Sequence, residues 1–282
     1  MKLSGSAEQT DQAEVIRFLA DPLTHGGVER VDHVETHGNL IFLVRSEAWK
    51  IKRAVRFRYM DFSTLEKRRA ACAREVEVNR RLAPEIYLGC VPIKRRVDGT
   101  LGMGGSGEVV EWTVHMRRFE QSALLSNIAA SGGIGAELAK AVADVVHESH
   151  RHADRATSPP AVTQMSQLVG SVCKSLADSK VFNGEEVARF SNLAEVQLSK
   201  AAPTLDERAR HGAVRRCHGD LHLGNIVVWS EHPVLYDAIE FDETIANIER
   251  SLRSRLSAHG SSLAWARASS ELGPQPLPPA LE

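Results

Sequence analysis

One stretch near the carboxyl end of the chain, residues 217–242, constrains the fold and the chemistry more than any other. It reads C-H-G-D-L-H-L-G-N-I-V-V-W-S-E-H-P-V-L-Y-D-A-I-E-F-D. Two short β-prone runs, 226–229 and 234–236, are separated by residues of turn composition, so the pattern predicts a hairpin. The loop before the first strand and the residue after the second strand are therefore expected to meet at one end of the hairpin.

Three polar residues flank this hairpin: Asp220 and Asn225 in the loop before it, and Asp237 after it. A carboxylate such as Asp220 can accept the proton of an attacking hydroxyl group. The oxygens of Asn225 and Asp237 suit Mg²⁺, a hard cation that prefers oxygen ligands. Catalysis of phosphoryl transfer consists mostly of positioning and charge stabilisation, and this order of residues is typical of kinase catalytic loops. The stretch therefore predicts a phosphotransferase in which these three residues are catalytic.

The motifs H-G-D-L-H-L-G-N and L-Y-D-A-I-E-F resemble the aminoglycoside phosphotransferase-like, or protein-kinase-like, family. More narrowly, the chain is similar to the kinase half of bacterial bifunctional aminoglycoside phosphotransferase/ATP-binding proteins. Residues 60–69 (M-D-F-S-T-L-E-K-R-R), 79–89 (N-R-R-L-A-P-E-I-Y-L-G) and 116–119 (M-R-R-F) agree with this resemblance, which covers roughly residues 10 to 248.

The resemblance implies an α+β, two-lobe fold of the protein-kinase type. A β-rich N-lobe is expected over residues 1–118 and a mostly helical C-lobe over residues 119–248. Helical spacing predicts the C-lobe helices at 121–152, 164–180 and 184–211. The implied activity is transfer of the γ-phosphate of ATP, with Mg²⁺, to a hydroxyl group of a small molecule.

Two lysines lie in the third strand of a predicted β-meander over residues 31–59. Because alternate residues of a strand share a face, Lys50 and Lys52 are expected to point the same way. The resemblance implies that one of them holds the α- and β-phosphates of ATP. The Tyr-Lys-Leu-Lys pattern of the family favours Lys50, with Lys52 as a second candidate, and the alternative is a pair of solvated strand lysines.

Residues 63–82 form the clearest predicted helix, and Ser63 and Glu66 have the spacing of a capping box. Glu75 lies close to the apolar stripe of this helix, and the resemblance implies that it pairs with the strand lysine. Glu77 is the nearby competitor, but its position two residues away points it to a different face. The alternative for Glu75 is an ordinary exposed helix glutamate.

A G-x-G-x-x-G match within residues 98–107 is not interpreted as a phosphate loop. A Rossmann loop runs into a helix, whereas this stretch runs into an alternating, strand-like segment, and it follows the lysine strand instead of preceding it. The resemblance places these glycines in a hairpin turn. It implies instead a nucleotide-covering turn at 36–39, where Gly38 permits close backbone approach, and an adenine-binding linker that begins at Met116.

The formal net charge of the 282 residues is −1, so no global field attracts the chain to nucleic acid or to a membrane. No stretch approaches the length of a membrane span, and no apolar run of signal length occurs at the N-terminus. The cysteine spacing, without a C-x-x-C pair, indicates reduced thiols. These properties predict a cytoplasmic protein that binds neither nucleic acid nor a membrane, and the resemblance implies that its partners are ATP and a small-molecule hydroxyl acceptor.

The histidines suggest a second class of site. The loop has an H-x-D-x-H pattern, formed by His218, Asp220 and His222, which is compatible with a metal-dependent hydrolase. Such a site needs further metal ligands. His147 and His150 share a helix face and form a weaker metal candidate. The kinase interpretation is favoured because it also explains Asn225 and Asp237, and it leaves His218 as a structural residue of the loop.

The last segment, residues 249–282, is rich in Arg, Ser, Ala and Pro, which predicts a poorly ordered end. The resemblance implies packing helices at this place, so we interpret the change as a disrupted reading frame near residue 249. No G-x-x-x-x-G-K-[ST] sequence occurs, and the P-loop half of the longer relatives is therefore not expected. A catalytically impaired or vestigial nucleotide-binding protein is the alternative to an active kinase.

Overall fold

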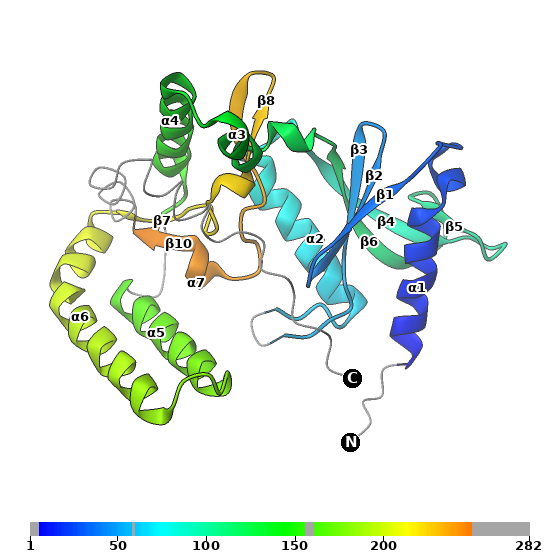
Figure 1. Cartoon of the computed structure of the whole chain (residues 1–282). Coiled ribbons are helices and arrows are strands. Elements are labelled where there is room, and N and C mark those ends of the chain that lie inside the picture. The colour runs from blue at the N-terminus through cyan, green and yellow to red at the C-terminus, as the bar shows by residue number, and fades with distance from the viewer. Residues whose placement is uncertain (1–5, 58–59, 156–160, 250–282) are drawn as a thin grey trace. The chain divides into compact units, whose positions relative to one another are not determined.

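The computed structural model describes residues 6–57, 60–155 and 161–249 (Figure 1). The chain divides into two compact units, each of which is described by itself. The first unit comprises Met1–Leu125 and Asp220–Glu243, and the second comprises Ser126–Gly219 and Thr244–Glu282. An antiparallel sheet in the first unit and helices in the second give the α+β class that the sequence predicts. The lobe boundary after residue 118 stays a prediction.

The first unit is built on a six-stranded sheet in the order β1-β2-β3-β6-β4-β5, with every neighbouring pair antiparallel. The strands are β1 (Asp32–Glu35), β2 (Asn39–Val44), β3 (Glu47–Lys52), β4 (Tyr87–Arg95), β5 (Leu101–Met103) and β6 (Glu108–Arg117). The predicted meander over residues 31–59 corresponds to β1, β2 and β3, although its third strand ends earlier than predicted, at Lys52. The glycine-rich stretch 98–107 contains β5, which forms a hairpin with β4, and the turn that leads on to β6, so only part of it corresponds to the expected hairpin turn.

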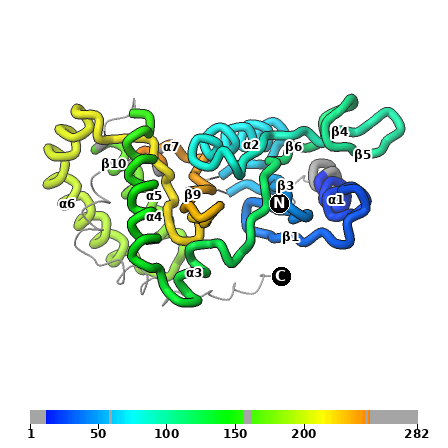
Figure 2. Tube along the Cα trace, turned by 90° about the horizontal axis from the view of Figure 1, so that it is seen from above, coloured from blue at the N-terminus to red at the C-terminus, as the bar shows by residue number. Residues whose placement is uncertain are grey.

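Two helices cover opposite faces of this sheet (Figure 2). On one face, Val15 and Leu19 of α1 (Ser6–Ala20) pack with Ile51 of β3 in one apolar cluster. On the other face, Cys72 and Val76 of α2 (Leu65–Arg80) pack with Ala48 of β3 in a second cluster. Since β3 alternates between these faces, its even-numbered residues, including both lysines, point toward α2.

The start of α2 differs from the prediction. Its N-cap is Thr64, whose side-chain oxygen accepts a hydrogen bond from the Lys67 N–H at 3.3 Å. The predicted capping box of Ser63 and Glu66 is therefore wrong. The physical reason is local competition, because the Ser63 hydroxyl group donates to the carboxylate of Asp61 at 2.6 Å and is engaged before the helix begins.

The predicted hairpin near the carboxyl end is confirmed. It consists of β8 (Ile226–Trp229) and β9 (His232–Leu235), which are paired antiparallel. The two residues between them, Ser230 and Glu231, have φ angles of 46° and 69°. Two consecutive left-handed residues are typical of the tight turns whose twist matches that of paired strands. The short 3₁₀ helix η3 (Leu223–Asn225) leads into β8.

The second unit is mostly helical. The predicted helix over 121–152 is interrupted at Gly133, whose φ of 84° ends the first of its two parts. The long helices α5 and α6 lie side by side and are joined by a turn in which Asn183 and Glu186 form a capping box. The first unit also contains the short 3₁₀ helices η1 (Pro22–His25) and η2 (Gln121–Ala123). The other elements of the chain are α3 (Leu125–Gly132), α4 (Ala136–His152), α5 (Ala161–Asp178), α6 (Gly184–Arg210), β7 (Val214–Arg216), α7 (Glu243–Ala246) and β10 (Asn247–Glu249).

The described residues end at Glu249, in a strand that pairs antiparallel with β7. The rest of the predicted tail, residues 250–282, lies outside the described residues. Within the described ranges, none of the helices combines the length and the apolar character needed to cross a bilayer.

Candidate functional site

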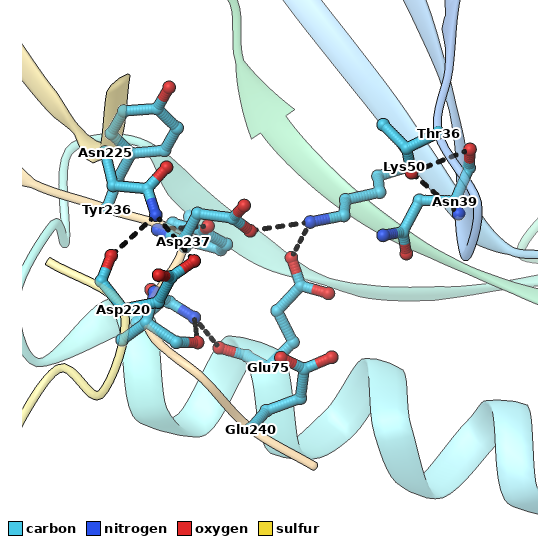
Figure 3. Close-up of polar contacts among 12 residues, drawn as sticks. Thr36, Asn39, Lys50, Glu75, Asp220, Asn225, Tyr236, Asp237 and Glu240 are labelled. Atoms are coloured by element: carbon cyan, nitrogen blue, oxygen red, sulfur yellow. Dashed lines mark hydrogen bonds and ion pairs between the residues drawn. The ribbon is translucent and has the colours of Figure 1, made fainter. Parts of the chain in front are cut away.

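A buried carboxylate on α2, that of Glu75, contacts both lysines of β3, and Figure 3 shows its contact with Lys50. Glu75 is fully buried, and its two oxygens contact different lysines. Its Oε1 lies 2.9 Å from the Lys50 Nζ, and its Oε2 lies 2.5 Å from the Lys52 Nζ. The predicted common face of the two lysines is confirmed, and the alternative of solvated strand lysines is wrong because both are buried.

The charges in this cluster stabilise one another. Burial alone disfavours the ionised form of Glu75, but Lys50 and Lys52 outweigh it and hold the pKa of Glu75 below its ordinary value. Burial likewise disfavours the charged form of Lys50, but Asp237 and Glu75 raise its pKa well above the ordinary value. Glu75, Lys50 and Lys52 are therefore ionised at neutral pH. Glu77, the competing helix residue, is exposed and pairs with Arg74 at 2.9 Å.

Asp220 and Asn225 form the second part of the site. The side-chain Nδ2 of Asn225 donates to the Asp220 carbonyl oxygen at 2.9 Å and lies 3.5 Å from its carboxylate Oδ2. The amide of Asn225 is buried, whereas 57% of the Asp220 side chain is exposed. The loop between them is held by His222, whose Nδ1 accepts from the Gly224 N–H at 3.0 Å. The Asp220 carboxylate is thus fixed at its backbone and open to a reactant.

Asp237 completes the site from the far end of the hairpin. Its φ is 59°, its N–H donates to the hydroxyl group of Tyr87 at 3.2 Å, and its carboxylate accepts from Lys50 at 2.8 Å. The preceding residue, Tyr236, donates its N–H to the Asn225 carbonyl oxygen at 3.1 Å. The hairpin therefore brings the two predicted metal ligands to the same end, as the sequence pattern requires. These residues all belong to the first unit.

Three residues of the site were missed by sequence reasoning. Glu240 accepts from Lys52 at 2.6 Å, Asn79 binds the backbone of the residue after Asp237, and Tyr87 binds the N–H of Asp237. The sequence position of Asn79 could have indicated its role, because it lies four residues after Glu75 and therefore on the same face of α2. Glu240 lies in the quoted L-Y-D-A-I-E-F motif, but nothing in its spacing indicates a partner 188 residues away.

The other two predicted site residues lie elsewhere in the first unit. Gly38 is in the turn between β1 and β2, where a Cβ atom would come within 2.6 Å of the Met60 side chain. Met116 is buried in the apolar cluster on the α2 face of the sheet. Neither takes part in the ion pairs that the described residues form around Glu75. Their proposed contacts with a nucleotide stay predictions.

The histidine-rich loop is the place that the hydrolase alternative assigns to a metal ion. The Nε2 of His222 lies 3.7 Å from a carboxylate oxygen of Asp220. In the part of the chain that the structure describes, no group of three or more His, Cys, Asp or Glu side chains is placed to hold a metal ion. This finding also covers His147 and His150 on α4.

A cavity of about 790 Å³ lies against α2 and the segment that follows Asp237. Of the residues around Glu75, only Glu240 lines it. The described residues that line it are Arg56, Phe57, Met60, Asp61, Phe62, Lys67, Ala70, Ala71, Arg74, Glu240 and Phe241.

Comparison with known proteins identifies the class. The model of the phosphotransferase enzyme family, APH, matches residues 38–237, so the chain belongs to this family. Its similar proteins include uncharacterized proteins of Mycobacterium tuberculosis (strain H37Rv) and Mycobacterium bovis, each 27% identical over 225 residues. That alignment covers 78% of this chain but 43% of each relative, so the chain spans less than half of their length.

Two solved structures are also similar. One is the GDP and kanamycin complex of APH(2")-IIia, with 13% identity and a TM-score of 0.42 over 83% of this chain and 74% of that chain. The other is choline kinase from Cryptosporidium parvum Iowa II, with 14% identity and a TM-score of 0.43 over 82% of this chain and 66% of that chain.

Proposed function

We propose that the chain catalyses Mg²⁺-dependent transfer of the γ-phosphoryl group of ATP to a hydroxyl group of a small molecule. The observation that carries the proposal is the buried Lys50 ammonium, which lies between Glu75 at 2.9 Å and Asp237 at 2.8 Å. A lysine paired with a helix glutamate beside a metal-binding aspartate is the arrangement that kinases use to hold ATP phosphates. Membership of the phosphotransferase enzyme family supports the same reaction class.

The donor set suits a magnesium ion. The side-chain nitrogen of Asn225 is turned to Asp220, so its side-chain oxygen Oδ1 is the atom that would bind a cation, and the Asp237 carboxylate is partly exposed. Amide and carboxylate oxygens are ligands that Mg²⁺ accepts together with phosphate oxygens and water. The bound ion would supply neutralisation of the charge on the phosphates. Asn225 and Asp237 would hold it, and no thiol or imidazole is needed.

The remaining residues have separate roles in this proposal. Lys50 holds the α- and β-phosphates, and Glu75 keeps its ammonium group in place. Asp220 accepts the proton of the acceptor hydroxyl group, which its exposed carboxylate is able to reach. The turn at Gly38 would cover the nucleotide and the segment from Met116 would bind adenine, as the resemblance implies.

The acceptor is proposed as a class only. The resemblance to the kinase half of bifunctional aminoglycoside phosphotransferase/ATP-binding proteins favours a small molecule over a protein. The alignment covers 43% of the mycobacterial relative, so this chain is similar to one part of that longer protein, as the resemblance to a kinase half implies.

A thermal melt with and without Mg²⁺ and ATP tests the proposal. A competent site saturated at 100 times Kd gains about 2.7 kcal/mol, and the upward shift should require metal and nucleotide together. An ADP-release assay over a panel of hydroxyl compounds then reports turnover. Asp220→Asn should abolish turnover and keep the thermal shift. Unchanged turnover would refute the role of Asp220, and a wild-type chain without any shift would favour the vestigial alternative.

A further inference from the structure

A second ion pair lies beside the site and is not used by the proposed function. Lys52 and Glu240 contact each other at 2.6 Å, and their side chains are 1% and 8% exposed. Burial disfavours the charged form of Lys52, but Glu75 and Glu240 outweigh it and raise its pKa above the ordinary value. The Lys52 ammonium is therefore charged inside the fold, where a buried ion pair persists only if its geometry is well satisfied.

This pair closes a ring of side chains around the site. From Asp237, the ring passes through Lys50 to Glu75, then through Lys52 to Glu240, with contacts of 2.8, 2.9, 2.5 and 2.6 Å. Glu240 is only three residues after Asp237, so the backbone closes the ring. A shift of any one member changes the position of the others.

The two lysines are not equivalent in this ring. The second partner of Lys50 is Asp237, whose side chain is 45% exposed, so the Lys50 ammonium lies at the open side of the site. The Lys52 ammonium is enclosed by two carboxylates and lies 5.2 Å from the centre of the Phe62 ring. Each ammonium group has two carboxylate partners, but only Lys50 has a partly exposed one, so Lys50 is the lysine that a phosphate group can approach.

We infer that Lys52 and Glu240 are positioning residues, which hold Glu75 and Asp237 in the places where Lys50 can bind phosphate and Asp237 can bind metal. The inference rests on the proposed function and deepens it. Without Glu240, the buried Lys52 would retain one carboxylate partner and would compete with Lys50 for Glu75. Without Lys52, Glu240 would lose its partner, and the segment from Asp237 would lose its anchor on β3.

The experiment compares Glu240→Gln and Glu240→Asp with the control Glu111→Gln. Glu111 also forms a buried ion pair, with Arg68 at 2.8 Å, but it lies outside the ring. Calorimetric titration with ATP, in Mg²⁺ and in EDTA, measures binding independently of turnover. Glu240→Gln should weaken Mg²⁺-dependent ATP binding by about 10- to 100-fold, as the loss of partners behind metal ligands does elsewhere. Glu240→Asp keeps the charge and should recover part of the affinity.

The control separates positioning from mere stability. Glu111→Gln should lower the melting temperature and leave ATP affinity unchanged at temperatures where the protein is folded. If Glu240→Gln also melts earlier but binds Mg²⁺ and ATP like the wild type, the pair is only structural and the inference is overturned. A folded wild-type chain that binds no Mg²⁺-ATP overturns the proposed function and this inference together. Lys52→Met is a second variant should Glu240→Gln fail to fold, and the same affinity loss is expected of it.

Discussion

Asn79 binds the main chain of Ala238 through both ends of its amide group. Its Oδ1 accepts from the Ala238 N–H at 2.7 Å, and its Nδ2 donates to the Ala238 carbonyl oxygen at 3.2 Å. Ala238 follows Asp237, whose backbone is in the left-handed region that non-glycine residues seldom adopt. Since α2 carries both Asn79 and Glu75, one helix holds the segment after Asp237 and the carboxylate that pairs with both lysines.

Replacing Asn79 by alanine should destabilise the protein and loosen this segment. The change leaves a buried N–H and a buried carbonyl group of Ala238 without their amide partner, at a cost of about 1–3 kcal/mol. Urea denaturation measures the free energy of unfolding. The matched control is Asn127→Ala on an exposed part of α3, which should change that free energy by less than about 0.5 kcal/mol. Equal effects of the two variants would contradict the anchoring role of Asn79.

The two glutamates of α2 should differ sharply in their effect on stability. Glu75→Gln leaves two buried lysines with one carboxylate partner fewer, and breaking a buried pair costs about 3–5 kcal/mol. Glu77→Gln removes an exposed contact with Arg74 and should cost less than about 1 kcal/mol. Chemical denaturation at pH 7 checks both values. A loss of similar size in the two variants would show that the buried cluster does not stabilise the fold.

The stability difference between the wild type and Glu75→Gln should depend on pH. The pKa of Glu75 is lowered in the fold because Lys50 and Lys52 outweigh the effect of burial. Its ionised form therefore stabilises the fold above the ordinary pKa of about 4.5, and this contribution is lost as pH falls through the lower folded value. Unfolding free energies measured between pH 7 and pH 3 should show the difference narrowing only below about pH 4.5. A difference that stays constant down to pH 3 would contradict the lowered pKa.

Tyr236→Phe should isolate one hydrogen bond of the catalytic loop. The Tyr236 hydroxyl group donates to the Gly224 carbonyl oxygen at 2.7 Å, and its ring packs against Phe119 with centroids 5.0 Å apart. The substitution keeps the ring and removes the donor, so a loss of about 0.5–1.5 kcal/mol is expected. Denaturation gives this value, and amide exchange of residues 220–225 reports whether the loop opens more often. An unchanged exchange rate would show that the bond does not restrain the loop.

Local patterns in the sequence account for the parts of the site that were predicted. The hairpin was predicted because turn composition separates two β-prone runs, and this information lies within residues 226–236. The common face of Lys50 and Lys52 was predicted because strand alternation is a property of the backbone. The capping box at Ser63 was wrong for a local reason as well, since Asp61 competes for the same hydroxyl group.

The contacts around the site could not be read from such patterns. Asn79 and Ala238 are 159 residues apart, and Lys52 and Glu240 are 188 residues apart. Periodicity tells which face of an element a residue occupies, but it does not tell which other element covers that face. For this reason Glu240 and Asn79 were missed, although both lie in stretches that carried the family resemblance.

The sequence by itself determined the family, the order of the polar residues along the catalytic loop, and the hairpin that brings Asp237 back to Asn225. These features follow from residue spacing and from backbone geometry over short distances. Only the tertiary structure decided that Glu75 lies between two lysines and that Lys52 faces Glu240. The physical reason is that burial of these charges requires partners from α2, β3 and the segment after β9, and packing alone brings those three elements together.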